Sequence, residues 1–315
     1  MALSNEIWVA AGTYRAGTDP TNRMATFRMK SWVNLYGGFD GTETDRGQRN
    51  WTNNVSVLDG DTLGDDAGFS NNVENVYHVV SGTNNATLDG FTVRGGNANG
   101  TSPHDRGGGM YNSMASFTVR NCVFARNSAS SRGGGLYDLS ASVSLVERSV
   151  FAGNRAAGTG MGGGMYSSGA GAHTIRGCQF TDNTADRGAA IYATAASPAI
   201  ENCAFSGNSA VNYAGAVWLS GAGLPTVLNC GFYGNAATWG GGIYAQFPAL
   251  TATVANCTFS GNSATNYGGA WQASASALNA MNCVLWDNRA GMGGAEIYTS
   301  GGAGTMGFAL PAAVG

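Results

Sequence analysis

The sequence has little charge and almost no lysine. Only 11% of its 315 residues are Asp, Glu, Lys or Arg, the formal net charge is −3, and Lys30 is the one lysine. This balance lacks the basic surface by which nucleic-acid-binding proteins neutralise phosphates. The sequence also has no run of 18 apolar residues, so it predicts no membrane-spanning helix. We therefore expect neither nucleic acid nor a membrane core among its partners.

Amphipathic helices are also missing from the pattern. Glycine occupies 50 positions, and each glycine inside a helix costs about 1 kcal/mol relative to alanine. Short runs rich in β-branched and aromatic residues lie instead between Gly and Asn corners, at 116–124, 198–205 and 253–259. Such runs are typical of β-strands. The sequence predicts an all-β fold.

A repeat organises the chain from Gly107 to about Ser300. Each copy opens with a glycine-rich step, such as GGGMY at 107–111 or GGGIY at 240–244, and most copies close with Phe-x-x-Asn. The closing asparagines are separated by 25 to 29 residues and are Asn127, Asn154, Asn183, Asn208, Asn235, Asn262 and Asn288. So regular a period is typical of a solenoid. A repeat of this length can hold three short strands and three turns, which predicts a parallel β-helix whose rungs lie about 4.8 Å apart.

The cysteines share one repeat position. Each lies two residues before the closing Phe or Leu, and the copy that lacks a cysteine has Ser149 there; they are Cys122, Cys178, Cys203, Cys230, Cys257 and Cys283. An even number of cysteines can indicate a disulfide framework. Stacked rungs place this position in one column, which favours buried free thiols.

The asparagines form two columns. The closing asparagines are expected to be buried at turns, where their side chains bond the main chain. A second, less complete column directly precedes the cysteines, at Asn121, Asn202, Asn229, Asn256 and Asn282. We predict a structural ladder of the closing asparagines, because no active site needs the same residue in every repeat.

An aliphatic and an aromatic column follow the glycine step. The aliphatic positions are Met110, Leu136, Met165, Ile191, Val217, Ile243, Ala270 and Ile297, and the next residues are Tyr111, Tyr137, Tyr166, Tyr192, Trp218, Tyr244, Trp271 and Tyr298. Neighbours on a strand point to opposite faces. We expect the aliphatic column to fill the core and the aromatic column to form an exposed binding stripe.

A mixed column directly precedes the glycine step. Its residues are Arg106, Arg132, Met161, Arg187, Tyr213, Trp239, Tyr267 and Met292. Arginine can pair with acidic groups, and aromatic rings can stack on sugar faces. Together with the aromatic column it could line a floor for an extended polymer, with Tyr213, Trp239 and Tyr267 as binding residues. The alternative interpretation is that this column only shields a glycine-rich sheet.

The N-terminal third contains degenerate rungs and polar loops. Strands are expected within 7–14 and 24–39, and early rungs at 76–82 and 86–98. The segment 56–66 brings Asp59, Asp61, Asp65 and Asp66 into one glycine-containing loop. Several loop carboxylates suit calcium, which makes these residues a tentative metal site, although acidic turns are common without one. No other cofactor is expected.

The domain organisation follows from these patterns. We expect one continuous domain, with degenerate rungs at 1–106, regular repeats at 107–303 and an apolar tail at 304–315 that covers the last rung. The first residues, MALSNEIWVAAGTY, lead directly into a strand without a signal-peptide pattern, so 1–6 is interpreted as a truncated start. The Asn-, Gly-, Ser- and Thr-rich composition nevertheless favours an extracellular or cell-surface protein. Open strand edges at the ends predict end-to-end self-association.

The motifs resemble those of a known family. The alternation of the Gly-Gly-aliphatic step with Phe-x-x-Asn resembles the repeat of chlamydial polymorphic outer-membrane proteins. IWVAAGTY at 7–14, YGGF at 36–39, VLDGD at 57–61 and LDGFTVRGGNA at 88–98 occur in the order seen in pectate-lyase-like bacterial surface proteins. The resemblance covers nearly the whole chain. It implies a right-handed, single-stranded parallel β-helix with about 27 residues per rung and an adhesin-like role.

Two functional hypotheses remain. The first is a non-catalytic extracellular module, structural or adhesive, that contacts a polysaccharide or a surface protein along the aromatic stripe. The alternative is a lyase or hydrolase of an acidic polysaccharide, for which two carboxylates about 5–10 Å apart, or a base beside an arginine, would be needed. Its candidates are Asp105, Arg106, Arg132, Asp138, Asp186 and Arg187. The uniform repeats favour the first hypothesis, because an active site usually interrupts such a pattern.

Overall fold

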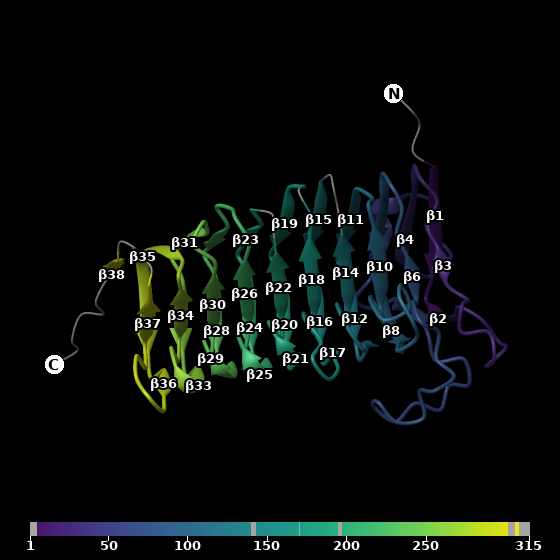
Figure 1. Ribbon diagram of the computed structural model, residues 1–315. Helices are drawn as coiled ribbons and strands as arrows, with labels where there is room; N and C mark the ends of the chain where they lie inside the picture. Colours follow the sequence, from purple (N-terminus) through teal and green to yellow (C-terminus); the bar gives the residue numbers. More distant parts are fainter. Residues whose placement is uncertain (1–4, 140–142, 170, 195–196, 302–305, 309–315) are drawn as a thin grey trace.

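The protein is an elongated parallel β-helix with its first and last described strands, β1 (Asn5–Ala10) and β38 (Met306–Phe308), at opposite ends of the stack (Figure 1). The computed structural model describes residues 5–139, 143–169, 171–194, 197–301 and 306–308. All named strands pair in parallel with strands of the neighbouring rungs, as between β14 (Leu136–Leu139) and β18 (Met165–Ser168). No helix among the described residues is long and apolar enough to cross a membrane.

Most regular rungs contain four short strands, one more than the sequence predicted, whereas the rung that begins at Trp271 has three because β35 (Ala277–Trp286) is continuous. A typical rung consists of β14 (Leu136–Leu139), β15 (Ser144–Glu147), β16 (Val150–Ala152) and β17 (Arg155–Ala156). The extra division comes from a left-handed residue between the second and third strands, Arg148 in this rung with φ 47°. Such a residue bends the chain and ends the regular pleat.

The strands assemble into three long sheets. The ten-stranded sheet contains β3 (Phe27–Arg28), β6 (Val80–Ser81), β10 (Met110–Ser113), β14, β18, β22 (Ile191–Thr194), β26 (Val217–Ser220), β30 (Ile243–Gln246), β34 (Trp271–Ser274) and β37 (Ile297–Ser300). The eight-stranded sheet contains β9 (Asn97–Ala98), β13 (Ser128–Ala129), β17, β21 (Thr184–Arg187), β25 (Ser209–Tyr213), β29 (Ala236–Trp239), β33 (Ser263–Tyr267) and β36 (Arg289–Ala290).

The third sheet is bent and has twenty strands. It contains β1 (Asn5–Ala10), β2 (Gly12–Arg15), β4 (Val33–Phe39), β5 (Ser56–Asp59), β7 (Ala86–Asp89), β8 (Phe91–Arg94), β11 (Phe117–Arg120), β12 (Val123–Ala125), β15, β16, β19 (His173–Arg176), β20 (Gln179–Thr181), β23 (Ala199–Glu201), β24 (Ala204–Ser206), β27 (Thr226–Leu228), β28 (Gly231–Tyr233), β31 (Thr251–Ala255), β32 (Thr258–Ser260), β35 (Ala277–Trp286) and β38 (Met306–Phe308). The short 3-10 helix η1 (Arg46–Gln48) lies in the polar loop after β4.

The core is built from columns of like residues, as the repeat predicts. Phenylalanines of successive rungs stack with ring centroids 4.5 to 5.2 Å apart, from Phe124 to Phe259. All six cysteines lie beside them as buried free thiols, which confirms the thiol prediction. Burial raises the pKa of Cys122 to about 12, so this thiol is held in its unreactive, protonated form.

The closing asparagines form the predicted ladder. Each of them is buried, and between neighbouring rungs both the backbone N–H and Nδ2 of one asparagine donate to Oδ1 of the next, as from Asn183 to Asn208 at 3.1 and 2.9 Å. The other hydrogen of Nδ2 is donated to the carbonyl oxygen of a core phenylalanine, which is Phe151 in the case of Asn183. The ladder therefore satisfies polar groups that the turn would otherwise leave unpaired inside the stack.

Left-handed residues fix the corners. The second asparagine column occupies one such corner, with φ between 50° and 54° at Asn121, Asn202, Asn229, Asn256 and Asn282. Asparagine tolerates this conformation better than other residues that carry a Cβ. At the first position of the glycine step Gly240 has φ 66°, and a Cβ built there would lie 2.6 Å from the carbonyl oxygen of Ile243. The glycine step is thus a backbone requirement of the turn.

The N-terminal rungs continue the same stack. β6 pairs with β10 and β9 pairs with β13, so the rungs before and after Gly107 are joined by regular parallel pairing. β1 pairs with β4 and lies at the N-terminal end of the stack in Figure 1. Of the tail expected to cover the last rung, 304–305 and 309–315 lie outside the described residues, and β38 pairs with β35.

Candidate functional site

The aromatic column lies on the outer face of the ten-stranded sheet, but it is not exposed. Tyr137, Tyr166, Tyr192, Trp218 and Tyr244 are between 1% and 9% exposed, and successive rings stack with centroids 4.8 to 5.4 Å apart. We call these five residues, with Tyr111 and Tyr298 at the ends, the inner aromatic row. Strand parity correctly predicted that it faces away from the core, whereas the prediction of an exposed stripe was wrong.

One member of the predicted column occupies a different position. Trp271 pairs with Ile243 and is buried in the main core, while Gln272 pairs with Tyr244. The step GGAW at 268–271 is one residue shorter before its aromatic than the step GGGIY at 240–244. Trp271 therefore replaces the aliphatic residue, and the assignment of Ala270 to the aliphatic column was wrong by one position.

The mixed column covers the inner aromatic row. Its residues from Arg106 to Tyr267 are aligned by successive parallel bridges and strand pairs. The guanidinium carbon of Arg132 lies 5.2 Å from the ring centroid of Tyr166, and that of Arg187 lies 5.7 Å from the ring of Trp218. These contacts support the shielding interpretation for the inner row. Met292 does not continue the mixed column in the structure, because Tyr267 is bridged to Gly293 instead.

Three covering residues of the C-terminal rungs, together with Tyr298 from the end of the inner aromatic row, form an aromatic surface of their own. Tyr213, Trp239, Tyr267 and Tyr298 are partly exposed. Their ring centroids follow one another at 6.4, 5.5 and 4.2 Å. We call these four residues the aromatic ridge. It differs from the stripe predicted from the sequence, although all four of its members belonged to the predicted binding set.

A shallow groove of about 310 Å³ lies beside the aromatic ridge. It is lined by nine residues of β25, β29 and β33 that directly precede the ridge on the same strands: Ser209, Ala210, Val211, Ala236, Ala237, Thr238, Ser263, Ala264 and Thr265. Most of these side chains are small, and Val211 is 67% exposed. Sequence reasoning did not single out this groove, whose signal is the recurrence of Ala, Ser and Thr before Tyr213, Trp239 and Tyr267.

The alternative catalytic residues do not come together as one site. Asp105 pairs with Arg106, and Asp186 pairs with Arg187, each at 3.2 Å between nitrogen and oxygen. Asp186 also accepts a hydrogen bond from Asn212. Arg132 lies between these pairs in the mixed column and covers Tyr166. Both aspartates, of which Asp105 is partly exposed and Asp186 is buried, thus already have basic neighbours that neutralise them.

Asp138 lies inside the solenoid. It is fully buried, and its Oδ2 is 2.9 Å from Nδ1 of His173 and accepts a hydrogen bond from Ser144 at 2.7 Å. His173 belongs to β19 and is 1% exposed, and residue spacing alone does not place it next to Asp138. This buried network is closed to a substrate in the structure, so the structure gives no support to the predicted catalytic role of Asp138.

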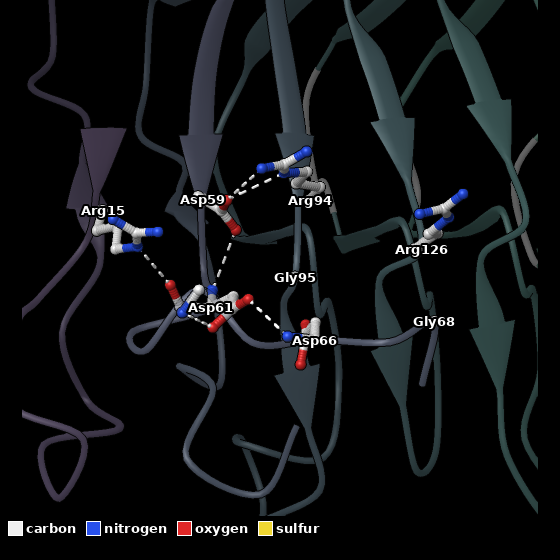
Figure 2. A pocket seen from close by; sticks show the side chains of 9 residues that line it. Arg15, Asp59, Asp61, Asp66, Gly68, Arg94, Gly95 and Arg126 are labelled. Atoms are coloured by element: carbon white, nitrogen blue, oxygen red, sulfur yellow. Dashed lines mark hydrogen bonds and ion pairs between the residues drawn. The ribbon is translucent and has the colours of Figure 1, made fainter. Parts of the chain in front are cut away.

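The acidic loop residues lie close together in part. One oxygen from each of Asp61, Asp65, Asp66 and Glu74 lies within 4.8 Å of the others; we call these four residues the acidic cluster. Glu74 was missed because it follows the predicted loop by eight residues. Asp59, which was predicted as a ligand, is instead paired with Arg94 at 2.8 Å. Figure 2 shows Asp61 and Asp66 beside this ion pair.

The surroundings of the acidic cluster are polar and partly enclosed. A cavity of about 150 Å³ is lined by Asp61, Asp66, Arg15 and Arg126, among others. Burial raises the pKa of Asp66 to about 6, and the neighbouring Asp61 and Glu74 add to this effect, while the hydrogen bond from Asn75 opposes it. The guanidinium group of Arg15 donates a hydrogen bond to the carbonyl oxygen of Asp61, and that of Arg94 donates to the carboxylate of Asp59.

The fold and these columns define a right-handed parallel β-helix. A family model described as "Right handed beta helix region" matches residues 107–305, so the chain belongs to this family. The match confirms the predicted handedness and fold class. No curated protein is significantly similar in sequence to the chain.

One solved structure is similar in fold. It is the catalytic unit of a thermostable GH87 α-1,3-glucanase from Streptomyces thermodiastaticus strain HF3-3, with 14% sequence identity and a TM-score of 0.36. The comparison covers 96% of this chain and 64% of the glucanase chain. This chain therefore spans less than two thirds of the length of that structure, and a likeness at this level carries no argument about function.

Proposed function

We propose that the chain is a non-catalytic extracellular or cell-surface module that binds an extended polymer along the aromatic ridge. The single observation that carries the proposal is the stack of four partly exposed rings that follow one another at 4.2 to 6.4 Å. Aromatic faces offer apolar contact area at small entropic cost. A polysaccharide is the favoured ligand, because sugar rings present flat apolar faces together with hydroxyl groups.

The groove and the inner aromatic row support this proposal. The small side chains of β25, β29 and β33 leave room for a polymer chain beside the rings. Below the ridge, the ring of Tyr213 contacts Trp218 edge-on at 5.1 Å and Tyr244 at 4.9 Å. The ridge is thereby held in place before a ligand binds, which lowers the entropic cost of binding.

The repeat motifs support a more specific assignment within the β-helix family. The Gly-Gly-aliphatic and Phe-x-x-Asn elements belong, in this proposal, to repeats of the chlamydial polymorphic outer-membrane protein type in a pectate-lyase-like surface protein. This assignment and the composition favour an adhesive role outside the cell. A surface protein is the alternative ligand, and it would use the same ridge.

Affinity gel electrophoresis against neutral and acidic polysaccharides tests the proposal. Wild-type protein should be retarded by at least one polymer, and the double variant Trp239→Ala/Tyr267→Ala should lose most of that retardation. Tyr233→Ala is the matched control, because this tyrosine is 46% exposed and lies on β28, outside the ridge. Equal retardation of wild type and double variant would overturn the proposed site.

The same incubations test the alternative hypothesis of a lyase or hydrolase. Samples are assayed for new reducing ends and for unsaturated products. Product formation by wild type that is lost in Arg132→Ala or Asp186→Asn would favour the enzyme. Retardation without product would favour the binding module.

A further inference from the structure

The acidic cluster has the dimensions of a calcium site. Calcium is bound by oxygens at about 2.3–2.6 Å, so two ligands on opposite sides of the ion are about 4.6–5.2 Å apart. The oxygens of the acidic cluster lie within 4.8 Å of one another. Magnesium requires oxygens at about 2.0–2.1 Å in near-ideal octahedral geometry, which a loop of carboxylates satisfies less readily.

A second observation comes from the oxygens that lack donors. Among the described residues, Asp66 Oδ1, Glu74 Oε1 and Asn75 Oδ1 are buried without a hydrogen-bond partner. All of these atoms are acceptors, and a buried acceptor without a donor is destabilising by about 1–3 kcal/mol. Three such atoms in one short segment indicate that a positive group belongs between them.

Asn75 directs its side chain into the acidic cluster. It is only 1% exposed, and its Nδ2 donates to Asp66 Oδ2 at 2.7 Å. The same Nδ2 donates to the carbonyl oxygen of Gly95 at 2.7 Å, which fixes the orientation of the amide. Amide carbonyl oxygens are regular calcium ligands, so Asn75 Oδ1 could complete the set.

Arginines lie near the acidic cluster, but their hydrogen bonds and ion pairs go to other groups. Within the described part of the chain, none of its four carboxylates forms an ion pair, since Arg94 pairs with Asp59. The guanidinium of Arg15 is hydrogen bonded to the carbonyl oxygen of Asp61 and not to its carboxylate. The carboxylate of Asp61 instead accepts hydrogen bonds from the backbone N–H groups of Gly64 and Asp66 at 2.5 and 3.1 Å.

We propose that the acidic cluster binds one calcium ion, which ties the segment 61–75 to the N-terminal rungs. Asp61 follows β5, whereas the other ligands lie further along the segment that connects β5 to β6. The same segment reaches the eight-stranded sheet, where the ring of Phe69 lies 5.9 Å from the guanidinium carbon of Arg155. Phe69 and Asn72 line a cavity of about 220 Å³ together with Ser128 and Ala129 of that sheet. The ion therefore orders a wall of this surface.

Titration of metal-free protein with calcium chloride in a calorimeter tests the proposal. We expect one ion per chain, with a dissociation constant on the order of 10⁻⁴–10⁻³ M, the range of extracellular modules. The melting temperature should rise with calcium and should rise much less with the same concentration of magnesium. Absence of saturable calcium binding at millimolar concentrations would overturn the proposal.

Variants locate the site. Glu74→Gln and Asp66→Asn should each weaken calcium binding by at least about 10-fold, as expected when a charged ligand is lost. Asp182→Asn, which changes an exposed turn aspartate of another rung, should bind as wild type does. In metal-free buffer Asp66→Asn should melt no lower than wild type, because it removes one of the repelling carboxylates. Unchanged affinity in both cluster variants would overturn this location.

Discussion

Asn208 and Asn235 are joined by two hydrogen bonds to a single oxygen. Oδ1 of Asn235 accepts the backbone N–H of Asn208 at 3.1 Å and its Nδ2 at 2.9 Å. The remaining Nδ2 hydrogen of Asn208 is directed to the carbonyl oxygen of Phe180 at 2.9 Å. One side chain therefore connects three successive rungs, and the same connection recurs along the stack.

Replacing Asn208 by alanine should lower the free energy of unfolding. The change removes the acceptor of the backbone N–H and of one Nδ2 hydrogen of Asn183, and it removes a donor to the carbonyl oxygen of Phe180, all in a buried interior. We expect a loss of about 1–3 kcal/mol for such unsatisfied buried groups. Urea unfolding followed by circular dichroism measures it. Asn99→Ala, at an exposed position, is the control. Equal small effects at both sites would contradict a stabilising contribution of the asparagine ladder.

The six thiols should be protected in the folded protein. Their column is buried. The hydrogen bond with the preceding cysteine is the main cause that raises the pKa of Cys203, Cys230 and Cys257 to about 12. A thiol reagent at neutral pH should therefore react with none of them until guanidinium chloride unfolds the chain, because the thiolate is the reactive form. Mass spectrometry that detects disulfides between rungs would contradict the ladder.

Gln272→Tyr should stabilise the protein. Gln272 is 4% exposed, its Oε1 has no hydrogen-bond partner among the described residues, and it interrupts the inner aromatic row between Tyr244 and Tyr298. Removing the unpaired oxygen and restoring the stack should contribute about 1–2 kcal/mol. The melting temperature measures the gain. Gln179→Tyr, at an exposed position of β20, should change it little, and a loss of stability in Gln272→Tyr would show that this rung has no room for the ring.

Stability should fall in mild acid because of His78. Burial lowers the pKa of this imidazole from 6.5 to about 4, and the neighbouring His104 adds to the effect. Between these two values the unfolded chain binds the proton more readily than the folded protein does. The contribution of His78 is therefore present above pH 6.5 and is lost as the pH falls towards 4, by up to about 3 kcal/mol.

The variant His78→Gln isolates the pH-dependent contribution of His78 to the free energy of unfolding. Glutamine can still donate to the carbonyl oxygen of Gly107, which His78 Nδ1 contacts at 3.1 Å. Urea unfolding of wild type and variant is compared at pH 7 and at pH 4.5. Wild type should lose more stability than the variant over this interval, and parallel losses would contradict the role of His78.

End-to-end association is expected through the N-terminal rung. Ile7, Trp8 and Tyr14 are 50%, 40% and 37% exposed on β1 and β2, which pair with β4 and β5. Open strand edges of this kind pair with other chains. Light scattering should show concentration-dependent growth of wild type and less growth of Ile7→Glu. A strict monomer at high concentration would contradict this expectation.

The columns could be predicted from the sequence, but the covering layer could not. The spacing of Asn127 and Asn154 and the position of the cysteines fix which residues face the core, because the repeat places them in register. Strand parity also gives the outward direction of Tyr137 correctly. It does not say whether another layer lies over that ring, and here Arg106 lies over it at 5.7 Å.

Two further features depend on three-dimensional proximity. Trp271 takes the aliphatic position and Gln272 takes the aromatic position of this rung. The reason is that the register follows the left-handed Gly268 and not the aromatic residue. Glu74 belongs to the acidic cluster and Asn75 contacts it because the segment after Asp66 turns back towards Asp66. Neither the return of a loop nor the choice between two alignments of a shortened step follows from residue spacing alone.

The asparagine ladder is also electrically polar. In every amide between the two ends of the row, Oδ1 accepts from the preceding asparagine and Nδ2 donates to the following one, as in Asn208. The amide dipoles therefore point the same way along the row and add, as peptide dipoles do in a helix. The row starts with Asn127, whose Oδ1 accepts the N–H of Gly96 at 3.1 Å, and ends with Asn288, whose Nδ2 donates to the Glu296 carboxylate at 2.6 Å. An anion thus terminates the positive end of the row. An asparagine at the same position of a further rung would compete with Glu296 for Nδ2 of Asn288.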